Sequence, residues 1–235
     1  MSDEAFANSE KLFRDAFALS DPAPELLNLI KAHPTYPAVV DLLVYYTDVV
    51  EENPSRAKAL ASALVAVRDS PDAPIIGDGT LAEHFSRKLA DLHSRGLEMS
   101  DDTKTFGATN TYLAASLLSG FSFKYDLTSS SDQYASIVEG LDAHDNSSIS
   151  EILVIGACIQ LLTNGSGIIP AATSYIKSAN EVAAKLKAQK SAGTVKDSNA
   201  LAVLELAISH AESGFKKEND IDNVWELLFP LPTLG

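Results

Sequence analysis

The chain has 235 residues, 46% of them hydrophobic, and its 32 acidic and 18 basic side chains give a formal charge of −14. A mean hydropathy of +0.02 is too apolar for a disordered chain. A sequence pI near 4.6 argues against DNA as a partner, because binding to a phosphate backbone depends on Lys and Arg.

No apolar run reaches the ~18–20 residues that a bilayer-spanning helix needs, so no membrane partner is expected. The acidic start Ser2-Asp3-Glu4 lacks the basic-then-apolar order of a signal peptide. A single cysteine, Cys158, cannot form an internal disulfide. We therefore expect a cytoplasmic or nuclear protein.

The first half of the chain is predicted to be helical throughout. Asp21-Pro22 and Asn53-Pro54 each place a capping residue ahead of a proline, which favours the start of a helix. The β-branched residues of segment 36–52 also admit a strand, but the segment is too long for one, so we expect a buried helix. The expected helices are 3–19, 22–32, 36–52, 54–68 and 80–94.

The second half continues the helical pattern. Ser148 and Glu151 have the spacing of a capping box, in which Glu151 reaches back to the cap residue. Asn164-Gly165 is expected to end that helix, and Pro170 is expected in the first turn of the next one. The expected helices are 100–118, 132–141, 152–163, 170–190, 198–213 (capped by Asp197 or Ser198 and ended by Gly214) and 221–229.

These segments predict an all-α protein with almost no strand. About eleven helices in this length place a helix pair every ~42 residues, within the period of HEAT and armadillo repeats. We expect one domain over residues 1–235, with antiparallel helix pairs stacked on each other and a short C-terminal docking helix at about 220–229. Because no residue-level repeat is found, an irregular multi-helix bundle is the alternative.

Motifs for cofactor binding or covalent catalysis are incomplete. The string from Ile152 to Gly156 is similar to the first strand and turn of a dinucleotide fold, but Cys158 and Leu161 stand where further glycines are needed. Cys158 itself lies among apolar residues, where a thiol behaves as a small hydrophobe. We expect no cofactor, no metal and no catalytic residue.

The alternative to a non-enzymatic protein is an all-α hydrolase or toxin with a carboxylate and histidine metal site. Its candidate residues are Glu83, His84 and Asp91 on one helix and His144 and Asp145 in a turn. No motif of known metal specificity accompanies them, and short acidic turns are usually solvated.

Positive charge gathers in one part of the chain. Residues 166–217 carry seven basic and four acidic side chains, whereas the chain as a whole is acidic. Lys177, Lys185, Lys187 and Lys190 form the one lysine-rich element. Three interpretations are open. The lysines form a solvated helix face, or they pair with this protein's own acidic helices, or they form a docking strip. The partner of such a strip would be an acidic protein or, as a weaker candidate, RNA.

The C-terminal segment carries the sole tryptophan. Ile221, Trp225 and Leu228 recur at i, i+4 and i+7 on an acidic stretch. This pattern is typical of helices that insert into a partner's groove. It is also typical of a terminal helix whose tryptophan packs on the protein's own core, and we favour the second interpretation.

Two stretches resemble a known family over about residues 36–215. They are 49–54, followed by Ala57, Ala61 and Leu64, and 158–165, which has the form C-x-x-L-L-T-x-G and is one residue out of step with the family's C-x-L-L-T-x-x-G. Tyr175-Ile176 and the helix ending at Gly214-Phe215 follow in the same order. These features are similar to the middle HEAT domain of translation-initiation scaffold proteins.

The resemblance implies a non-enzymatic scaffold that docks an RNA helicase or other proteins of translation or RNA decay. The aromatic residues expected after Pro54 and the family's basic surface are absent, so no functional residue is carried over. Our leading interpretation is a non-catalytic scaffold for protein–protein interaction, and the resemblance implies a role in translation or RNA metabolism. The sequence leaves the identity of the partner and the oligomeric state open.

Overall fold

The computed structural model contains only helices among the residues that it describes, which confirms the expected all-α class. These residues are 3–32, 50, 56–71, 83–84, 87, 90–91, 106–125, 127, 137, 140–142, 150–171 and 178–216. Within them lie α1 (Asp3–Ala18), α2 (Ala23–Ala32), α4 (Ala57–Arg68), α6 (Phe106–Lys124), α8 (Ser150–Ala171), α9 (Ala179–Ala192) and α10 (Ser198–Glu212).

The ends of α9 and α10 follow from local capping chemistry. Ser178 precedes α9, and its side chain accepts a hydrogen bond from the Glu181 amide at 3.2 Å. Gly193 ends α9 in the left-handed conformation with φ 67°, as glycine can without steric cost. Asp197 accepts from the amides of Asn199 and Ala200, both at 2.9 Å, which confirms it as the cap of α10.

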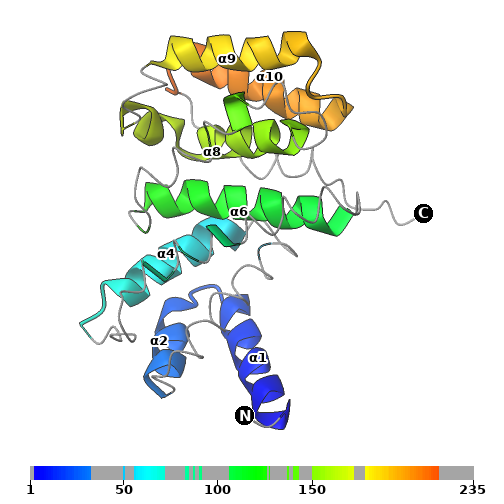
Figure 1. Ribbon diagram of the computed structural model, residues 1–235. Helices are drawn as coiled ribbons and strands as arrows, with labels where there is room; N and C mark the ends of the chain where they lie inside the picture. Colours follow the sequence, from blue (N-terminus) through cyan, green and yellow to red (C-terminus); the bar gives the residue numbers. More distant parts are fainter. Residues whose placement is uncertain are drawn as a thin grey trace.

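The helices pack in a regular order. α2, α4, α6, α8 and α10 each contact the next member of this row, while α1 packs against α2 and α9 against α10 (Figure 1). The row therefore follows the order of these helices along the chain. α6 and α8 occupy its middle, and α9 and α10 lie together at one end.

Contacts between named residues fix the helix directions. Gly156 of α8 lies against Tyr112 of α6, and Gly120 of α6 lies against Thr163 of α8, so the two helices run parallel. The start of α8 also contacts the start of α10 through Glu151, so these two helices run parallel as well. By contrast, α9 runs antiparallel to α10, as their side-chain pairs described below require.

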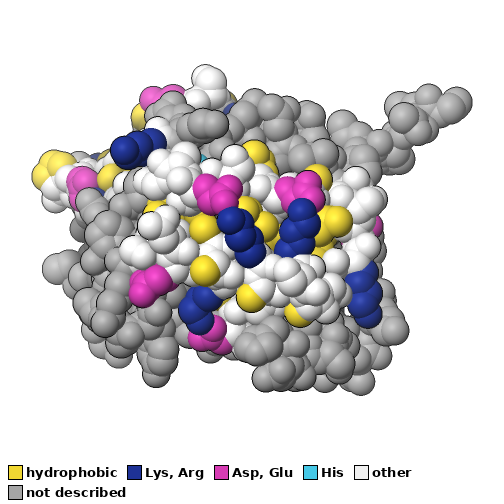
Figure 2. Space-filling model, turned by 90° about the horizontal axis from the view of Figure 1, so that it is seen from above, with side chains coloured by type: hydrophobic (Ala, Val, Ile, Leu, Met, Phe, Trp, Pro, Cys, Tyr) yellow, Lys and Arg dark blue, Asp and Glu magenta, His cyan; other side chains and the backbone are white. Residues whose placement is uncertain are grey.

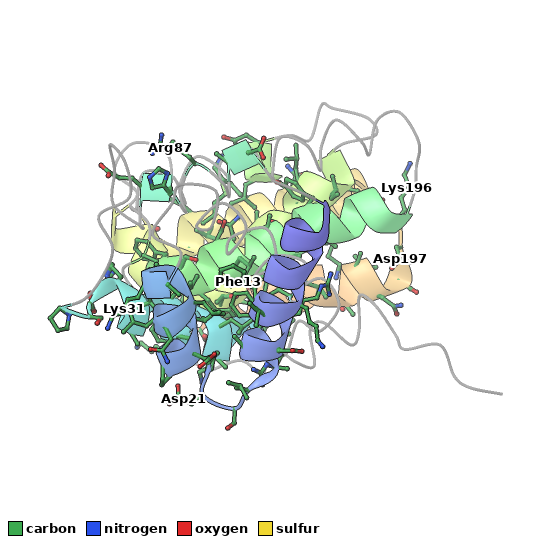
Figure 3. The ribbon with its side chains drawn as sticks, turned by 90° about the horizontal axis from the view of Figure 1, so that it is seen from below. Phe13, Asp21, Lys31, Arg87, Lys196 and Asp197 are labelled. Carbon is green, nitrogen blue, oxygen red and sulfur yellow. The ribbon has the colours of Figure 1, made fainter. Side chains whose placement is uncertain are left out.

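The core is centred on α6 and α8. Every residue of 112–121 and of 152–162 is buried. A helix that is buried on all sides has neighbours all around it, unlike the one-sided helices of a surface layer. The helices at the two ends of the row have exposed faces, and at one end Phe13 of α1 points inward between α1 and α2 (Figure 3).

Glycines bring the central helices unusually close. A Cβ atom built on Gly120 would lie 2.7 Å from Cβ of Thr163. One built on Gly140, in the short helical segment 140–142, would lie 2.1 Å from the backbone oxygen of Leu153. These positions accept no side chain without a shift of the neighbouring helix, so glycine is required there by packing.

An arginine ties the end of α1 to the start of α4. The Nη2 atom of Arg56 donates to the carbonyl oxygens of Phe17 and Leu19, each at 2.6 Å. Carbonyl groups at a helix C-terminus lack partners within the helix, and a guanidinium group satisfies them well.

Several expected boundaries are wrong. α8 does not end at Asn164-Gly165 but runs to Ala171, and Pro170 lies in its last turn rather than in the first turn of the next helix. α6 runs through Gly120 to Lys124 instead of ending before it. The packing of buried residues along these helices outweighs local propensities of about 1 kcal/mol per glycine.

The other expected boundaries fall partly outside the described residues. α1, α2, α4 and α10 lie within a few residues of their expected positions. Segment 36–52 lies outside apart from Val50, which is buried, and so does segment 217–235. The single domain and the HEAT-like pairing therefore stay predictions.

Candidate interaction surface on α9 and α10

The described lysines of the predicted strip lie on α9, and each pairs with a carboxylate of this chain. Lys185 pairs with Asp142 of segment 140–142, and Lys187 pairs with Glu212 of α10. Lys190 lies 2.5 Å from Oε1 of Glu205, also on α10. Figure 2 shows this face from above, with dark-blue lysines directly beside magenta carboxylates.

These pairs make the surface locally neutral rather than basic. The lysine side chains keep 30%, 55% and 43% of their exposure in the order above. Exposed ion pairs of this kind contribute only about 0.2–1 kcal/mol each. These ion pairs therefore orient the lysine side chains only weakly. A competing carboxylate can replace the partners of the lysines at little cost in free energy.

A buried polar side chain supports α9 from beneath. Gln189 is 1% exposed, and its Nε2 atom donates to the Leu141 carbonyl at 2.7 Å. Its Oε1 atom accepts from the Thr194 hydroxyl at 2.9 Å. Because buried amides are costly when unpaired, these two bonds fix the position of α9 relative to segment 140–142 and the loop that follows α9.

Glu151 holds the same loop from the other side. Its Oε1 atom accepts from the backbone amides of Lys196 and Asp197 at 3.0 and 3.1 Å. The expected bond from Glu151 to the cap residue Ser148 lies outside the described residues and stays a prediction. The structure adds a bond from Glu151 to the start of α10. Figure 3 shows Lys196 and Asp197 at this end of the molecule, on the opposite side of the view from Arg87.

Two other residues of the predicted interaction site are not placed. Lys177 and Trp225 lie outside the described residues. The expected continuous helix through Lys177 is wrong, however, because α8 ends at Ala171 and α9 begins at Ala179. The strip on α9 therefore consists of Lys185, Lys187 and Lys190.

The residues proposed for a metal site are only partly described. Glu83 and Asp91 are exposed, whereas His84 is buried. The Nδ1 atom of His84 lies 3.1 Å from Nη2 of Arg87, and it must accept, because a guanidinium can only donate. Among the described residues no group of three or more His, Cys, Asp or Glu is placed to hold a metal ion. His144 and Asp145 lie outside that part of the chain.

Cys158 lies at the centre of α8 and is fully buried. Burial raises the pKa of its thiol far above the ordinary value, because a thiolate would lose its hydration there. The string from Ile152 to Ala157, compared above with a dinucleotide-binding strand, is part of the same helix. The described surroundings give Cys158 a packing role.

The sequence analysis did not predict that His210 is buried. This residue of α10 is 5% exposed, and its ring lies against Phe215 beyond the helix end. Its spacing from Val203 and Ala207 places it on the buried face of the helix, which is the signal that could have identified it.

Comparisons of the chain with protein-family models, with curated protein sequences and with solved structures find no match. The resemblance to the middle HEAT domain of translation-initiation scaffolds therefore stays a prediction. Within the described part of the chain, no helix combines the length and apolar character that crossing a bilayer requires.

Proposed function

We propose that this protein is a non-catalytic helical scaffold that binds another protein through the surface of α9 and α10. The observation that carries the proposal is the packing order, in which α2, α4, α6, α8 and α10 form one row. Stacked helices of this kind create extended surfaces on which partners bind, and they need no catalytic group to do so.

The chemistry of the surface suggests an acidic segment as the partner. Lys185, Lys187 and Lys190 are held along one side of the molecule by weak, exposed ion pairs. Carboxylates of a partner that excludes water from the contact would compete with Glu205 and Glu212 for the same ammonium groups. A role in translation or RNA metabolism rests on the family resemblance alone.

The experiment compares three baits in quantitative affinity purification followed by mass spectrometry. We expect Lys187→Gln with Lys190→Gln to lose the partner captured by the wild-type protein. Glu205→Gln with Glu212→Gln should retain it or capture more, because the lysines are then released from their internal partners. Neutral substitutions are used because Lys→Glu would place like charges side by side on α9 and α10.

Lys58→Gln, at an exposed position of α4, is the matched control and should capture the same partner as the wild type. Thermal melting of every bait checks that folding is retained. Equal capture by the wild type and the double lysine variant would refute the proposed surface.

A further inference from the structure

The turn that ends α10 combines two left-handed residues in succession. Gly214 has φ 70° and Phe215 has φ 58°. The Gly214 amide donates to the Ala211 carbonyl at 2.9 Å, and the Phe215 amide donates to the His210 carbonyl at 3.0 Å. This is the Schellman arrangement, in which the left-handed glycine satisfies the last carbonyls of the helix.

The second left-handed residue needs a reason, because a bulky side chain is disfavoured in that region. The ring of Phe215 lies edge-on to the ring of His210, with centroids 5.0 Å apart and an interplanar angle of 77°. Both residues are buried, at 8% and 5% exposure. Schellman turns commonly include an apolar contact between these two positions, and here a histidine provides one side of it.

The histidine differs from an apolar residue in its two ring nitrogens. Its Nδ1 is buried and forms no hydrogen bond with the described part of the chain. An imidazolium ion carries hydrogen on both ring nitrogens. Protonation would therefore leave a charged ring in a buried place where Nδ1 has no described acceptor, which strongly disfavours the closed turn.

Few charged groups of the packed helices can offset this effect. In α8 the only titratable residues are Cys158 and Glu151, and Glu151 lies at the other end of α10 beside Asp197. On α9, Lys187 pairs with Glu212 and Lys190 pairs with Glu205. At 100° per residue, these two glutamates lie about 140–160° around the axis of α10 from His210, so they are on another face of the helix. The remaining charged residues of α9 are Lys185, paired with Asp142, and the exposed Glu181.

The helix dipole alone would favour a cation at this end of α10. Burial opposes it, and desolvation lowers the pKa of His210 below its ordinary value of 6.5. The closed turn therefore favours the neutral His210 ring, and protonation of that ring favours an open turn.

We propose that the turn from His210 to Phe215 is an acid-sensitive hinge, in which a proton on His210 drives its ring away from Phe215 and opens the turn. The chain leaves α10 at this point and continues as segment 217–235, which contains Trp225. The hinge thus makes the closure of the turn at the end of α10 depend on pH.

Amide hydrogen exchange measured by NMR on the full chain tests this hinge. The probes are the amides of Ser213, Gly214 and Phe215, which are bonded to carbonyls within the turn and α10. After correction for intrinsic exchange, we expect opening to increase from pH 7.5 to 5.5, by at most about tenfold, because the open ring titrates near 6.5 and the closed ring below it. The closed turn is fully stable above that pH and weakens as the pH falls.

The variant His210→Phe keeps an aromatic contact but cannot titrate, so its turn should open equally at both pH values. His84→Gln removes the other buried described histidine and should leave the response unchanged. The amides of Val203 and Leu204 in α10 distinguish turn opening from global unfolding.

Equal opening of the wild-type turn at both pH values would overturn the hinge. So would a response that persists in His210→Phe, or acceleration of the Val203 and Leu204 amides to the same extent as the turn. Direct titration of the wild-type ring by NMR is independent of any variant, and a pKa at or above 6.5 would also contradict the proposal.

Discussion

Gly156 stands at a point where α8 comes close to α6. A Cβ atom there would lie 2.6 Å from Cε1 of Tyr112 and 2.7 Å from Oγ of Ser116. Tyr112 is fully buried and Ser116 donates to the Tyr112 carbonyl at 3.0 Å, so neither group has room to move aside. The separation of α6 and α8 depends on the missing side chains of Gly156 and Gly120.

We therefore predict that Gly156→Ala destabilises the protein by about 1–3 kcal/mol, the usual effect of one extra carbon in a filled core. Equilibrium urea unfolding measures the change. The sign is informative, because Gly→Ala inside a helix otherwise stabilises by about 0.5–1 kcal/mol. Ala188→Ser adds one atom at an exposed site of α9 and should change stability by under about 0.5 kcal/mol. A stability gain in Gly156→Ala would contradict the close approach.

Among the described residues, Phe215 is the one non-glycine residue in the left-handed conformation. A left-handed residue with a Cβ atom is disfavoured by about 1–2 kcal/mol relative to the right-handed region. Burial of a phenylalanine side chain contributes about 1.5–3 kcal/mol, so its contact with His210 is sufficient to hold the conformation. At this residue, packing decides the backbone.

At the scale of helices, Glu151 is the connection between the start of α8 and the start of α10. One carboxylate oxygen accepts two backbone amides that lie 45 and 46 residues away in sequence. Asp197, which donates its amide to Glu151, in turn caps α10 with its own side chain. The carboxylates of Glu151 and Asp197 together therefore fix the start of α10.

Removal of the carboxylate in Glu151→Ala should lower the free energy of unfolding by about 1–2 kcal/mol, since hydrogen bonds to charged groups are stronger than neutral ones but these amides lie near the surface. Exchange of the Lys196 and Asp197 amides should accelerate more than that of Val203. Glu151→Gln is the matched control, because it keeps an acceptor oxygen and should lose less. Equal losses in the two variants would argue against this role.

The sequence predicted helix boundaries correctly where local capping signals are strong. It predicted them wrongly where contacts between residues distant in sequence determine the length of the helix. Asp197 and Gly214 bound α10 as their capping chemistry indicates. In contrast, Asn164, Gly165 and Pro170 are helix-breaking residues by propensity, yet α8 includes them all. A 22-residue helix that is buried over residues 152–162 extends beyond such signals, because packing along its length outweighs them.

The candidate site was predictable only in part, for a similar reason. The lysines of α9 are visible in the sequence as a local cluster, and pairing with the protein's own acidic helices was one of the interpretations considered. Which carboxylates pair with them depends on tertiary structure, since Asp142 lies 43 residues before Lys185. Local spacing cannot reveal a pair of that separation.

At the scale of the whole molecule, the charge of −14 is not spread evenly. The described lysines of α9 neutralise carboxylates from α10 and from segment 140–142. The end of the helix row formed by α9 and α10 is therefore close to neutral on a strongly acidic protein. Electrostatic repulsion of an acidic partner is reduced at that end, which is the surface proposed for binding.

The position of Cys158 makes the molecule a reporter of its own unfolding. The thiol is the chain's one cysteine and is fully enclosed between the central helices. A thiol reagent reaches it only after α8 separates from its neighbours, so labelling should be slow in buffer and accelerate steeply with urea. In Cys158→Ala with Ser191→Cys, an exposed thiol on α9 should react at once. Fast, urea-independent labelling of the wild type would show that the centre of the row opens without unfolding.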